Sequence, residues 1–317
     1  MRRYLLATLA VLTLALCAAG CRSKDEKPGG AGKLRVVTTI FPVYEFARNL
    51  AGDRAEVTML LPPGMEPHSF EPRPEDIVRV HKADLFVYTN PAMEPWAAEI
   101  LKGSGAARLT VVDASRGARL LKANGGGHDH SEEKGHHDDE EGIDPHLWLD
   151  FANARVMVEN IAAALEAKDP ANRDFYRANA AAYEAKLTAL DERYRSTLAT
   201  CAKRTFLHGG HFAFGYLAHR YGLQYQSAYA ASADAEPTPA RLAALVKKIR
   251  QEGLKVIYTE ELLDPRTAET VARETGATVL MLNGAHTIAR DDLSRGATFL
   301  SLMERNLDNL RVGLQCR

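Results

Sequence analysis

Apolar residues along the chain form short continuous runs that alternate with amphipathic stretches. In the first half, the runs that predict strands are 34–40, 56–61, 83–88 and 110–113. The stretches between them that predict helices are 43–50, 74–82 and 95–102. Strands separated by helices of this length indicate a parallel sheet covered by helices on both faces. The first half is therefore expected to form an α/β lobe.

The second half of the chain repeats this alternation. Its expected strands are 204–207, 255–259 and 278–282. Its expected helices are 213–221, 241–252, 265–275 and 296–314. Thr238 can cap the helix at 241–252 with Pro239 at its first position, and Asp264 can cap the next helix. Two halves of the same α/β type predict two lobes.

A long stretch without Gly or Pro lies between the two halves. Residues 174–200 predict one helix, which is longer than an average domain helix and which we interpret as a rigid connector. The preceding helix, 153–168, is interrupted by Pro170. The expected organisation is an N-terminal lobe at 34–168, a connecting helix at 169–200 and a C-terminal lobe at 201–317.

The first residues have the pattern of an export signal. A short basic segment precedes the apolar run 4–19, which is too short to span a membrane and ends in small residues. We expect residues 1–20 to be a signal peptide and the Pro- and Gly-containing residues 21–33 to be a flexible tether. No later segment is apolar enough to predict a transmembrane helix.

The end of this signal resembles a bacterial lipobox. Ala19-Gly20-Cys21 makes Cys21 the candidate lipidated first residue of the mature protein, although Ala18 stands where the lipobox usually has Leu or another branched residue. The exported protein is then expected in the periplasm or on the outer face of the cell membrane.

Composition limits the function classes. The chain has 317 residues, 46% of them hydrophobic and 26% charged, which is typical of a globular protein. At about 150 residues per domain, two domains are expected. The formal net charge of -1 offers no basic field for nucleic acid, so we expect no nucleic-acid partner.

Two cysteines remain after the signal peptide and Cys21, at positions 201 and 316. Export places them in an oxidising compartment, where a disulfide can fasten the C-terminus to the second lobe. Two unpaired buried thiols are the alternative.

Histidines are clustered in one polar tract. Residues 124–142 contain His128, His130, His136 and His137 among Gly, Asp and Glu, and the tract has no apolar residue to bury before Ile143. Such a composition predicts a disordered loop inside the first lobe.

Four other histidines follow expected strands or precede expected helices. They are His68, His146, His211 and His286, two in each lobe. Ligand sites in open α/β sheets lie beyond the carboxyl ends of the strands. Imidazole is the commonest metal ligand, and four imidazoles complete a tetrahedral shell. Together these positions favour a metal site in a cleft between the lobes.

The motifs around these histidines resemble those of the zinc/manganese substrate-binding proteins of bacterial ABC transporters. The matching segments are Pro-His-Ser-Phe-Glu-Pro, Asp-Pro-His-Leu-Trp-Leu, His-Phe-Ala-Phe-Gly-Tyr and Thr-Gly-Ala-Thr-Val-Leu-Met-Leu-Asn-Gly-Ala-His, within residues 34–316. The resemblance implies two α/β lobes joined by one long helix, with one metal ion between them. It also implies a non-enzymatic receptor that delivers its metal to a membrane ABC permease. We expect it to be a monomer.

The same resemblance assigns ligands. His68, His146 and His211 occupy the usual three ligand positions of the family. The fourth is a carboxylate in the loop after the last strand, but Asn283 stands at the common Asp position. His286 matches the place where some members have Glu and is our fourth ligand, with the alternatives Glu260 and Glu261.

Ligand type favours Zn²⁺ over Mn²⁺, because manganese prefers oxygen donors and imidazole suits zinc. The histidine-rich tract resembles the loop of zinc-carrying members. It can hold zinc weakly and raise its concentration near the cleft, or it is an acidic linker without a role.

Other side chains have less specific interpretations. His81 and His219 are expected at the surface. His208 is expected either to hydrogen-bond a ligand or to belong to the core, and Glu260 can also orient a ligand. Trp148 and Phe214 line the cleft or pack in the core.

Zinc uptake is the function that these observations favour, with only small lobe movements on release because of the long connecting helix. A manganese receptor of the same family, a zinc-dependent hydrolase and a surface adhesin are the alternatives. The hydrolase would need an open zinc position and a general base, and no His-Glu-x-x-His segment occurs.

Overall fold

The computed structural model describes residues 33–102, 108–123, 142–229 and 237–317. The described helices and strands lie within residues 34–317, which form a compact unit distinct from residues 1–33. The predicted signal peptide, Cys21 and the histidines of the polar tract lie outside the described residues. Among the described helices, none is long and apolar enough to cross a bilayer.

The N-terminal lobe is built on a four-stranded parallel sheet with the order β2-β1-β3-β4. The strands are β1 (Leu34–Thr38), β2 (Ala55–Met59), β3 (Leu85–Tyr88) and β4 (Thr110–Asp113). The helices of this lobe are α2 (Phe41–Ala51), α3 (Pro74–His81), α4 (Ala97–Lys102) and α5 (Phe151–Lys168), with the short η1 (Leu147–Leu149) before α5. Because the strands are parallel, their carboxyl ends share one edge of the sheet.

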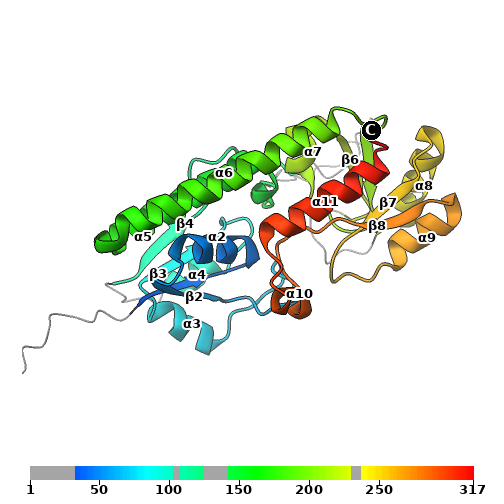
Figure 1. Cartoon of the computed structure of the whole chain (residues 1–317). Coiled ribbons are helices and arrows are strands. Elements are labelled where there is room, and N and C mark those ends of the chain that lie inside the picture. The colour runs from blue at the N-terminus through cyan, green and yellow to red at the C-terminus, as the bar shows by residue number, and fades with distance from the viewer. Residues whose placement is uncertain (1–32, 103–107, 124–141, 230–236) are drawn as a thin grey trace, which may run out of the picture. The chain divides into compact units, whose positions relative to one another are not determined.

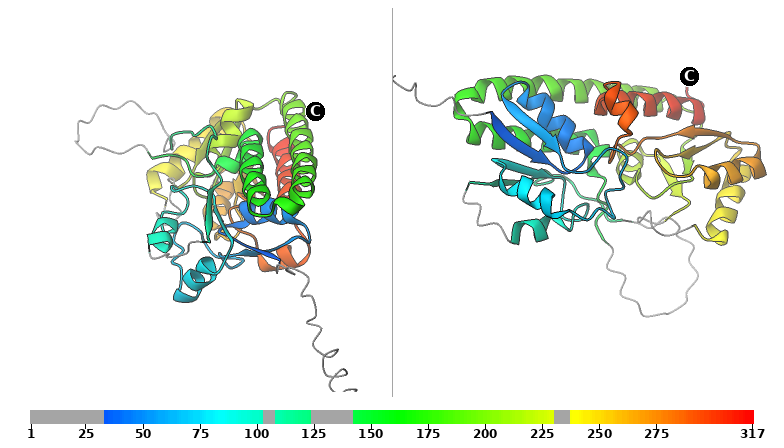
Figure 2. Two further views of the ribbon diagram at one scale, coloured as in Figure 1. Left: turned by 90° about the vertical axis from the view of Figure 1, so that its left-hand side faces the viewer. Right: turned by 90° about the horizontal axis from the view of Figure 1, so that it is seen from below.

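The C-terminal lobe has a second four-stranded parallel sheet with the order β6-β5-β7-β8, the same arrangement as the first. Its strands are β5 (Thr205–His208), β6 (Gln224–Ser227), β7 (Val256–Thr259) and β8 (Thr278–Met281). Its helices are α7 (Gly215–Tyr221), α8 (Pro239–Glu252), α9 (Arg266–Thr275), α10 (Arg290–Ser294) and α11 (Phe299–Gly313). Figure 2 shows the two sheets and their helices from two further sides.

The predicted fold class, two parallel-sheet α/β lobes with a long helix, is confirmed. One strand and one α-helix were not predicted. Strand β6 has the sequence Gln-Tyr-Gln-Ser and lies at the sheet edge, so it lacks the apolar run of a buried strand. Helix α10 has only five residues, two of them acidic, and is too short to show a helical period.

Local signals explain several helix ends. The Thr238 side chain accepts a hydrogen bond from the Arg241 backbone N–H at 3.3 Å, and proline occupies the first turn of α8, as expected. The Asp264 carboxylate accepts from the Arg266 N–H at 3.0 Å. Helix α9 ends at Gly276, which has a φ of 73° that favours glycine.

Helix α6 (Arg173–Leu198) follows the short η2 (Pro170–Asn172) and contacts α2 and α5 of the first lobe and α7 and α11 of the second (Figure 1). At 1.5 Å per residue its 26 residues span about 39 Å. Its buried apolar side chains recur every three or four positions: Tyr176, Ala180, Tyr183, Leu187, Leu190, Tyr194 and Leu198. The two lobes therefore share one apolar core along this helix.

A buried carboxylate also joins the lobes. Glu45 on α2 is 0% exposed, and its Oε2 accepts a hydrogen bond from the Phe299 backbone N–H, at the start of α11, at 3.2 Å. Its Oε1 accepts from the Arg48 guanidinium at 2.6 Å. Burial raises the pKa of Glu45, and Arg48 opposes that shift. The ring of Phe46 packs edge-to-face on Tyr183 of α6 and on Phe299. Helices from both lobes and the connector thus meet at one point.

We expect Glu45→Ala to lower the free energy of unfolding by about 1–3 kcal/mol, because it leaves the Phe299 amide without its acceptor. Urea unfolding measures this loss. Glu45→Gln keeps an acceptor and should lose less. The control is the exposed Glu56→Ala, and an equal loss in Glu45→Ala and Glu56→Ala would contradict this role.

Cys201 and Cys316 form a disulfide, across which their backbones also make an isolated β-bridge. The bond fastens the end of the chain to the segment that enters β5. The disulfide prediction is confirmed, and the alternative of two free thiols is wrong.

Candidate metal centre

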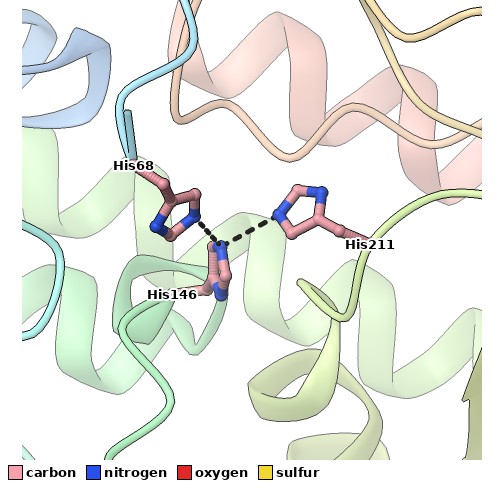
Figure 3. A group of neighbouring side chains, drawn as sticks. All are labelled: His68, His146 and His211. Carbon is pink, nitrogen blue, oxygen red and sulfur yellow. Dashed lines mark hydrogen bonds between the residues drawn. The ribbon is translucent and has the colours of Figure 1, made fainter. Parts of the chain in front are cut away.

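Three of the predicted histidines converge from three separate segments (Figure 3). His68 lies between β2 and α3, His146 directly precedes η1, and His211 lies between β5 and α7. The Nε2 atom of His146 is 3.4 Å from Nε2 of His68 and 3.2 Å from Nε2 of His211. His146 and His211 are almost completely buried, whereas His68 is partly exposed.

The spacing fits a tetrahedral metal ion. With Zn–N bonds of about 2.0–2.1 Å, two ligand nitrogens of a tetrahedral zinc lie about 3.3–3.4 Å apart. The two measured separations are within 0.2 Å of that value. Two of the three edges that a tetrahedral ligand face would need therefore have the length expected for zinc.

Asp144 orients His146. Its Oδ1 lies 2.9 Å from Nδ1 of the His146 ring and accepts from the His146 backbone N–H at 3.0 Å. Burial lowers the pKa of His146 well below its usual value, and the neighbouring histidines lower it further. Burial also raises the pKa of Asp144 to about 7. His146 is thus a neutral imidazole whose Nε2 lone pair faces the other rings.

Glu260, just beyond β7, orients His211 in the same way. Its Oε2 is 2.5 Å from Nδ1 of the His211 ring, and its Oε1 accepts from the His211 backbone N–H at 3.1 Å. Burial by itself would raise the pKa of Glu260, but the charge and hydrogen bond of His211 outweigh it and hold the pKa at about 2. For His211, burial lowers the pKa and the Glu260 carboxylate more than offsets it, so the net shift is upward.

The carboxylates of Asp144 and Glu260 favour a cation between the rings of His146 and His211. A carboxylate oxygen lies beside each Nδ1 atom, at 2.9 Å in His146 and 2.5 Å in His211, so the Nε2 atoms of the two rings are left facing each other at 3.2 Å. Two facing lone pairs repel unless a cation lies between them. A proton can bridge only two nitrogens, whereas a metal ion can bridge all three.

Gly210 allows Glu260 to approach so closely, and Gly209 makes room for α9. A Cβ atom at Gly210 would lie 2.5 Å from Oε1 of Glu260, and one at Gly209 would lie 2.7 Å from Cβ of Ala268. Any larger residue in this turn would displace either the carboxylate or α9. The Gly-Gly pair before His211 therefore belongs to the architecture of the centre.

His286 lies beside the other three histidines. Its ring centroid is 5.2 Å from that of His211, 6.2 Å from that of His146 and 6.5 Å from that of His68. It is 2% exposed, its Nδ1 makes no hydrogen bond with the described residues, and burial lowers its pKa to about 3. Its assignment as fourth ligand stays a prediction.

The two alternative fourth ligands are engaged elsewhere. Glu260 holds His211, and Glu261 accepts from the Gly284 backbone N–H at 3.0 and 3.1 Å. Burial raises the pKa of Glu261 to about 8, with the neighbouring Glu260 charge adding to the shift. Asn283, at the position of the expected carboxylate, accepts from the Ala285 N–H at 2.8 Å. Its side chain therefore shapes the loop that carries His286.

Trp148 and Phe214 are completely buried and also lie near the histidines. The Trp148 indole N–H donates to the Gly284 carbonyl oxygen at 2.8 Å, and its ring centroid is 5.5 Å from that of His146. Phe214 contacts the ring of His208, 5.0 Å away. Trp148 thus connects the first lobe to the loop of His286.

The described histidines that remain are His81, His208 and His219. His208 is buried, and its Nδ1 contacts the His211 backbone oxygen at 3.1 Å, so it supports the ligand loop rather than the ligand ring. His219 is exposed, as expected. His81 is half-buried, with its Nε2 3.1 Å from the Ile100 oxygen, so the expectation of a surface position holds only in part.

Sequence reasoning missed three supporting residues. Asp144 precedes its histidine by two positions, a spacing that could have indicated a local ring contact. Asn90 donates to the Pro145 carbonyl oxygen at 3.0 Å, and Tyr216 contacts the Asp144 oxygen at 3.0 Å. Neither of these contacts has a local sequence signal, because 55 and 72 positions separate the partners.

We expect Glu260→Ala to weaken zinc binding roughly 10–100-fold, the usual effect of removing the partner of a ligating histidine. Glu260→Gln keeps an acceptor for the ring N–H and should lose less. Competition with a chromophoric chelator measures the affinity. An exposed glutamate of α9, changed in Glu269→Ala, is the control, and unaltered affinity in Glu260→Ala would contradict the role.

A family model described as the zinc-uptake complex component A, periplasmic (ZnuA), matches residues 36–313. The high-affinity zinc uptake system protein ZnuA of Bacillus subtilis is 37% identical over 307 residues, which cover 96% of each chain. The chain belongs to the ZnuA family. The family predicted from the histidine motifs is confirmed.

Solved structures of the family have the same fold. The Zn(II)-bound ZnuA-like domain of AdcA from Streptococcus pneumoniae is 35% identical with a TM-score of 0.75, covering 89% of this chain and 99% of that one. Lmb of Streptococcus agalactiae, a laminin-binding protein described as having adhesin and metal transporting activity, is 29% identical with a TM-score of 0.78, covering 89% and 100%. This chain spans 60% of the full-length AdcA lipoprotein of Streptococcus pneumoniae.

These relatives agree with the predicted location and class. The family model describes a periplasmic component of a zinc-uptake complex, and AdcA is a zinc-binding lipoprotein. The family thus comprises exported solute-binding components of metal transport.

Proposed function

We propose that this protein binds one Zn²⁺ between its two lobes and delivers it to a membrane ABC permease for zinc uptake. The observation that carries the proposal is the meeting of His68, His146 and His211 at tetrahedral spacing, with the Nδ1 atoms of two of them held by carboxylates. His68 and His146 come from the first lobe and His211 from the second, so bound metal would hold the lobes together.

Zinc is favoured over manganese by the donor set. The described cluster presents imidazole nitrogens, and its two nearest carboxylates are turned to the far side of the rings. Imidazole suits zinc, whereas manganese prefers oxygen ligands. The zinc-binding relatives support the same choice.

We further propose that His286 completes the shell. It is buried next to His211, while Glu260 and Glu261 already bind other groups. Four protein ligands close a tetrahedral site, which suits a carrier and leaves no position for a reactive water. The protein is therefore proposed not to be an enzyme: Glu260, the only base considered for a hydrolase, is held against His211.

The segments outside the described residues complete the proposal. Residues 1–20 would be removed on export, and a lipid on Cys21 with the tether 21–33 would keep the monomeric protein at the membrane near its permease. The histidines of the tract 124–142 would collect zinc weakly. Ordering such a tract would cost conformational entropy, so the tight site is placed in the cleft.

Metal analysis with calorimetry tests the function. The purified protein should bind one tight Zn²⁺, and a variant lacking residues 124–142 should retain it. His68→Ala should weaken the tight site, whereas the exposed His219→Ala is the matched control. Loss of the tight zinc on deletion of the tract, with His68→Ala unaffected, would overturn the proposal. Metal-dependent hydrolysis of an ester or peptide would instead favour the enzyme.

A further inference from the structure

Helix α7 connects the His211 loop to the first lobe. It begins at Gly215, four positions after His211, and belongs to the C-terminal lobe. Tyr216 and Arg220 are one helical turn apart and therefore lie on the same face of the helix. The Tyr216 side chain is buried and that of Arg220 is 13% exposed. Both bind groups outside the C-terminal lobe.

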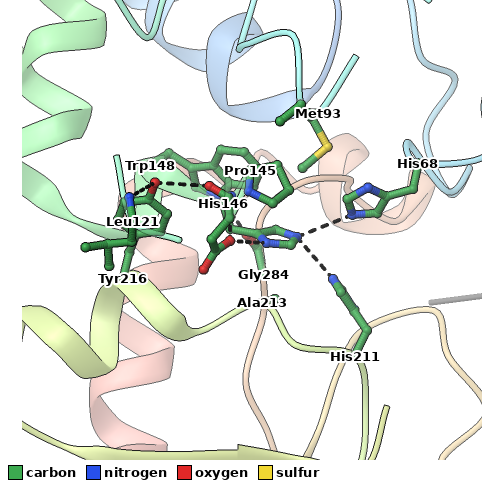
Figure 4. Close-up of polar contacts among 12 residues, drawn as sticks. His68, Met93, Leu121, Pro145, His146, Trp148, His211, Ala213, Tyr216 and Gly284 are labelled. Carbon is green, nitrogen blue, oxygen red and sulfur yellow. Dashed lines mark hydrogen bonds and ion pairs between the residues drawn. The ribbon is translucent and has the colours of Figure 1, made fainter. Parts of the chain in front are cut away.

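Tyr216 reaches the segment that holds His146 (Figure 4). Its hydroxyl donates to the Asp144 carbonyl oxygen at 3.0 Å and accepts from the Leu121 backbone N–H at 2.9 Å. Asp144 is also the residue whose carboxylate binds the His146 ring. Asp144 therefore connects α7 to the ring of His146: its carbonyl oxygen binds Tyr216 and its carboxylate contacts the imidazole.

Arg220 makes a second connection. Its Nη1 donates to Oδ1 of Asp150 at 2.5 Å, and its Nε donates to Oδ1 of Asp191 on α6 at 2.8 Å. The same Asp150 oxygen caps α5 by accepting from the Ala152 N–H at 2.8 Å. The Tyr221 hydroxyl also donates to Asp191, at 2.8 Å. One guanidinium thus links helices of the first lobe, the connector and the second lobe.

The start of α7 also packs closely against Asp144. A Cβ atom at Gly215 would lie 2.5 Å from Oδ2 of Asp144, so only glycine lets the start of α7 approach this carboxylate. Moving His211 away from His146 by separating the lobes would require α7 to leave Asp144 and Asp150. That motion breaks the bonds of Tyr216 and Arg220 together.

We infer that Tyr216 and Arg220 are positioning residues that hold His211 against His146 and thereby set the rate at which zinc leaves the cleft. This inference rests on the proposed function. Neither side chain touches the nitrogens that would bind the metal. They act by keeping those nitrogens 3.2 Å apart, so that zinc meets a preformed pair of ligands.

Zinc dissociation into an excess of chelator, followed by stopped flow, tests the inference. Tyr216→Phe removes only the hydroxyl, together with its two hydrogen bonds, and should speed dissociation by at least about fivefold, the effect expected for loss of one net hydrogen bond. Arg220→Gln should act in the same direction, and Arg220→Lys, which keeps the charge, should restore part of the slow rate. Thermal unfolding of the zinc-free variants measures any general loss of stability.

Tyr258→Phe is the matched control. Tyr258 is also buried, and its hydroxyl donates to the Asn309 carbonyl oxygen at 3.1 Å within the C-terminal lobe alone. A faster rate in Tyr216→Phe and not in Tyr258→Phe supports the inference. Equal rates in both variants, or no recovery in Arg220→Lys, overturn it. If the unaltered protein lacks one tight Zn²⁺, the proposed function itself fails, whatever the variants do.

Discussion

His146→Ala should abolish tight zinc binding. His146 is the central histidine of the cluster, with its Nε2 within 3.4 Å of those of both His68 and His211. The alanine variant lacks the one nitrogen donor of the cluster that lies near both His68 and His211. We therefore expect the affinity to fall by more than the roughly 10–100-fold that loss of an outer partner of a ligand costs.

Thermal unfolding with and without zinc measures this effect. A ligand that binds only the folded state stabilises it by about 4 kcal/mol at a free concentration a thousand times its dissociation constant. The zinc-dependent rise in melting temperature should be present in the unaltered protein and absent from His146→Ala. His219→Ala, which changes an exposed histidine of α7, should keep the full rise. A full rise in His146→Ala would remove this residue from the site.

Loss of the disulfide should have the largest effect on stability. Cys201 and Cys316 are 115 positions apart, and a crosslink that closes a loop of this size restricts the unfolded chain strongly. By the loop-entropy argument, the double variant Cys201→Ser, Cys316→Ser should lose about 4–5 kcal/mol of unfolding free energy. Guanidinium unfolding at equilibrium measures the loss.

Zinc binding should be retained in the double serine variant while it is folded. Cys201 precedes β5 and His211 follows it, so the disulfide and the ligand lie at opposite ends of that strand. The oxidised protein treated with a reductant should reproduce the stability of the variant. A loss below about 1 kcal/mol, the net size of one ordinary hydrogen bond, would contradict the argument.

Much of the fold could be predicted because its signals are local. The strands β1, β5 and β7 are short apolar runs, and α8 has its capping threonine and proline within a few positions of its start. The polar β6 had no such signal, because an edge strand needs fewer apolar side chains. The candidate histidines could be selected because each follows a predicted strand or precedes a predicted helix.

By itself, the sequence determined the α/β alternation, the long connecting helix and the histidines that could meet. Only the tertiary structure decided how they are held. Glu260 lies next to His211 because β7 pairs with β5 in the sheet, although 49 positions separate the two residues. Periodicity depends on near neighbours along the chain, whereas the distance between two imidazole nitrogens depends on strand order and helix packing. That is why the sequence could select the candidate histidines and offer Glu260 as an orienting residue, whereas the role of Asp144 and the contacts of α7 could not be predicted.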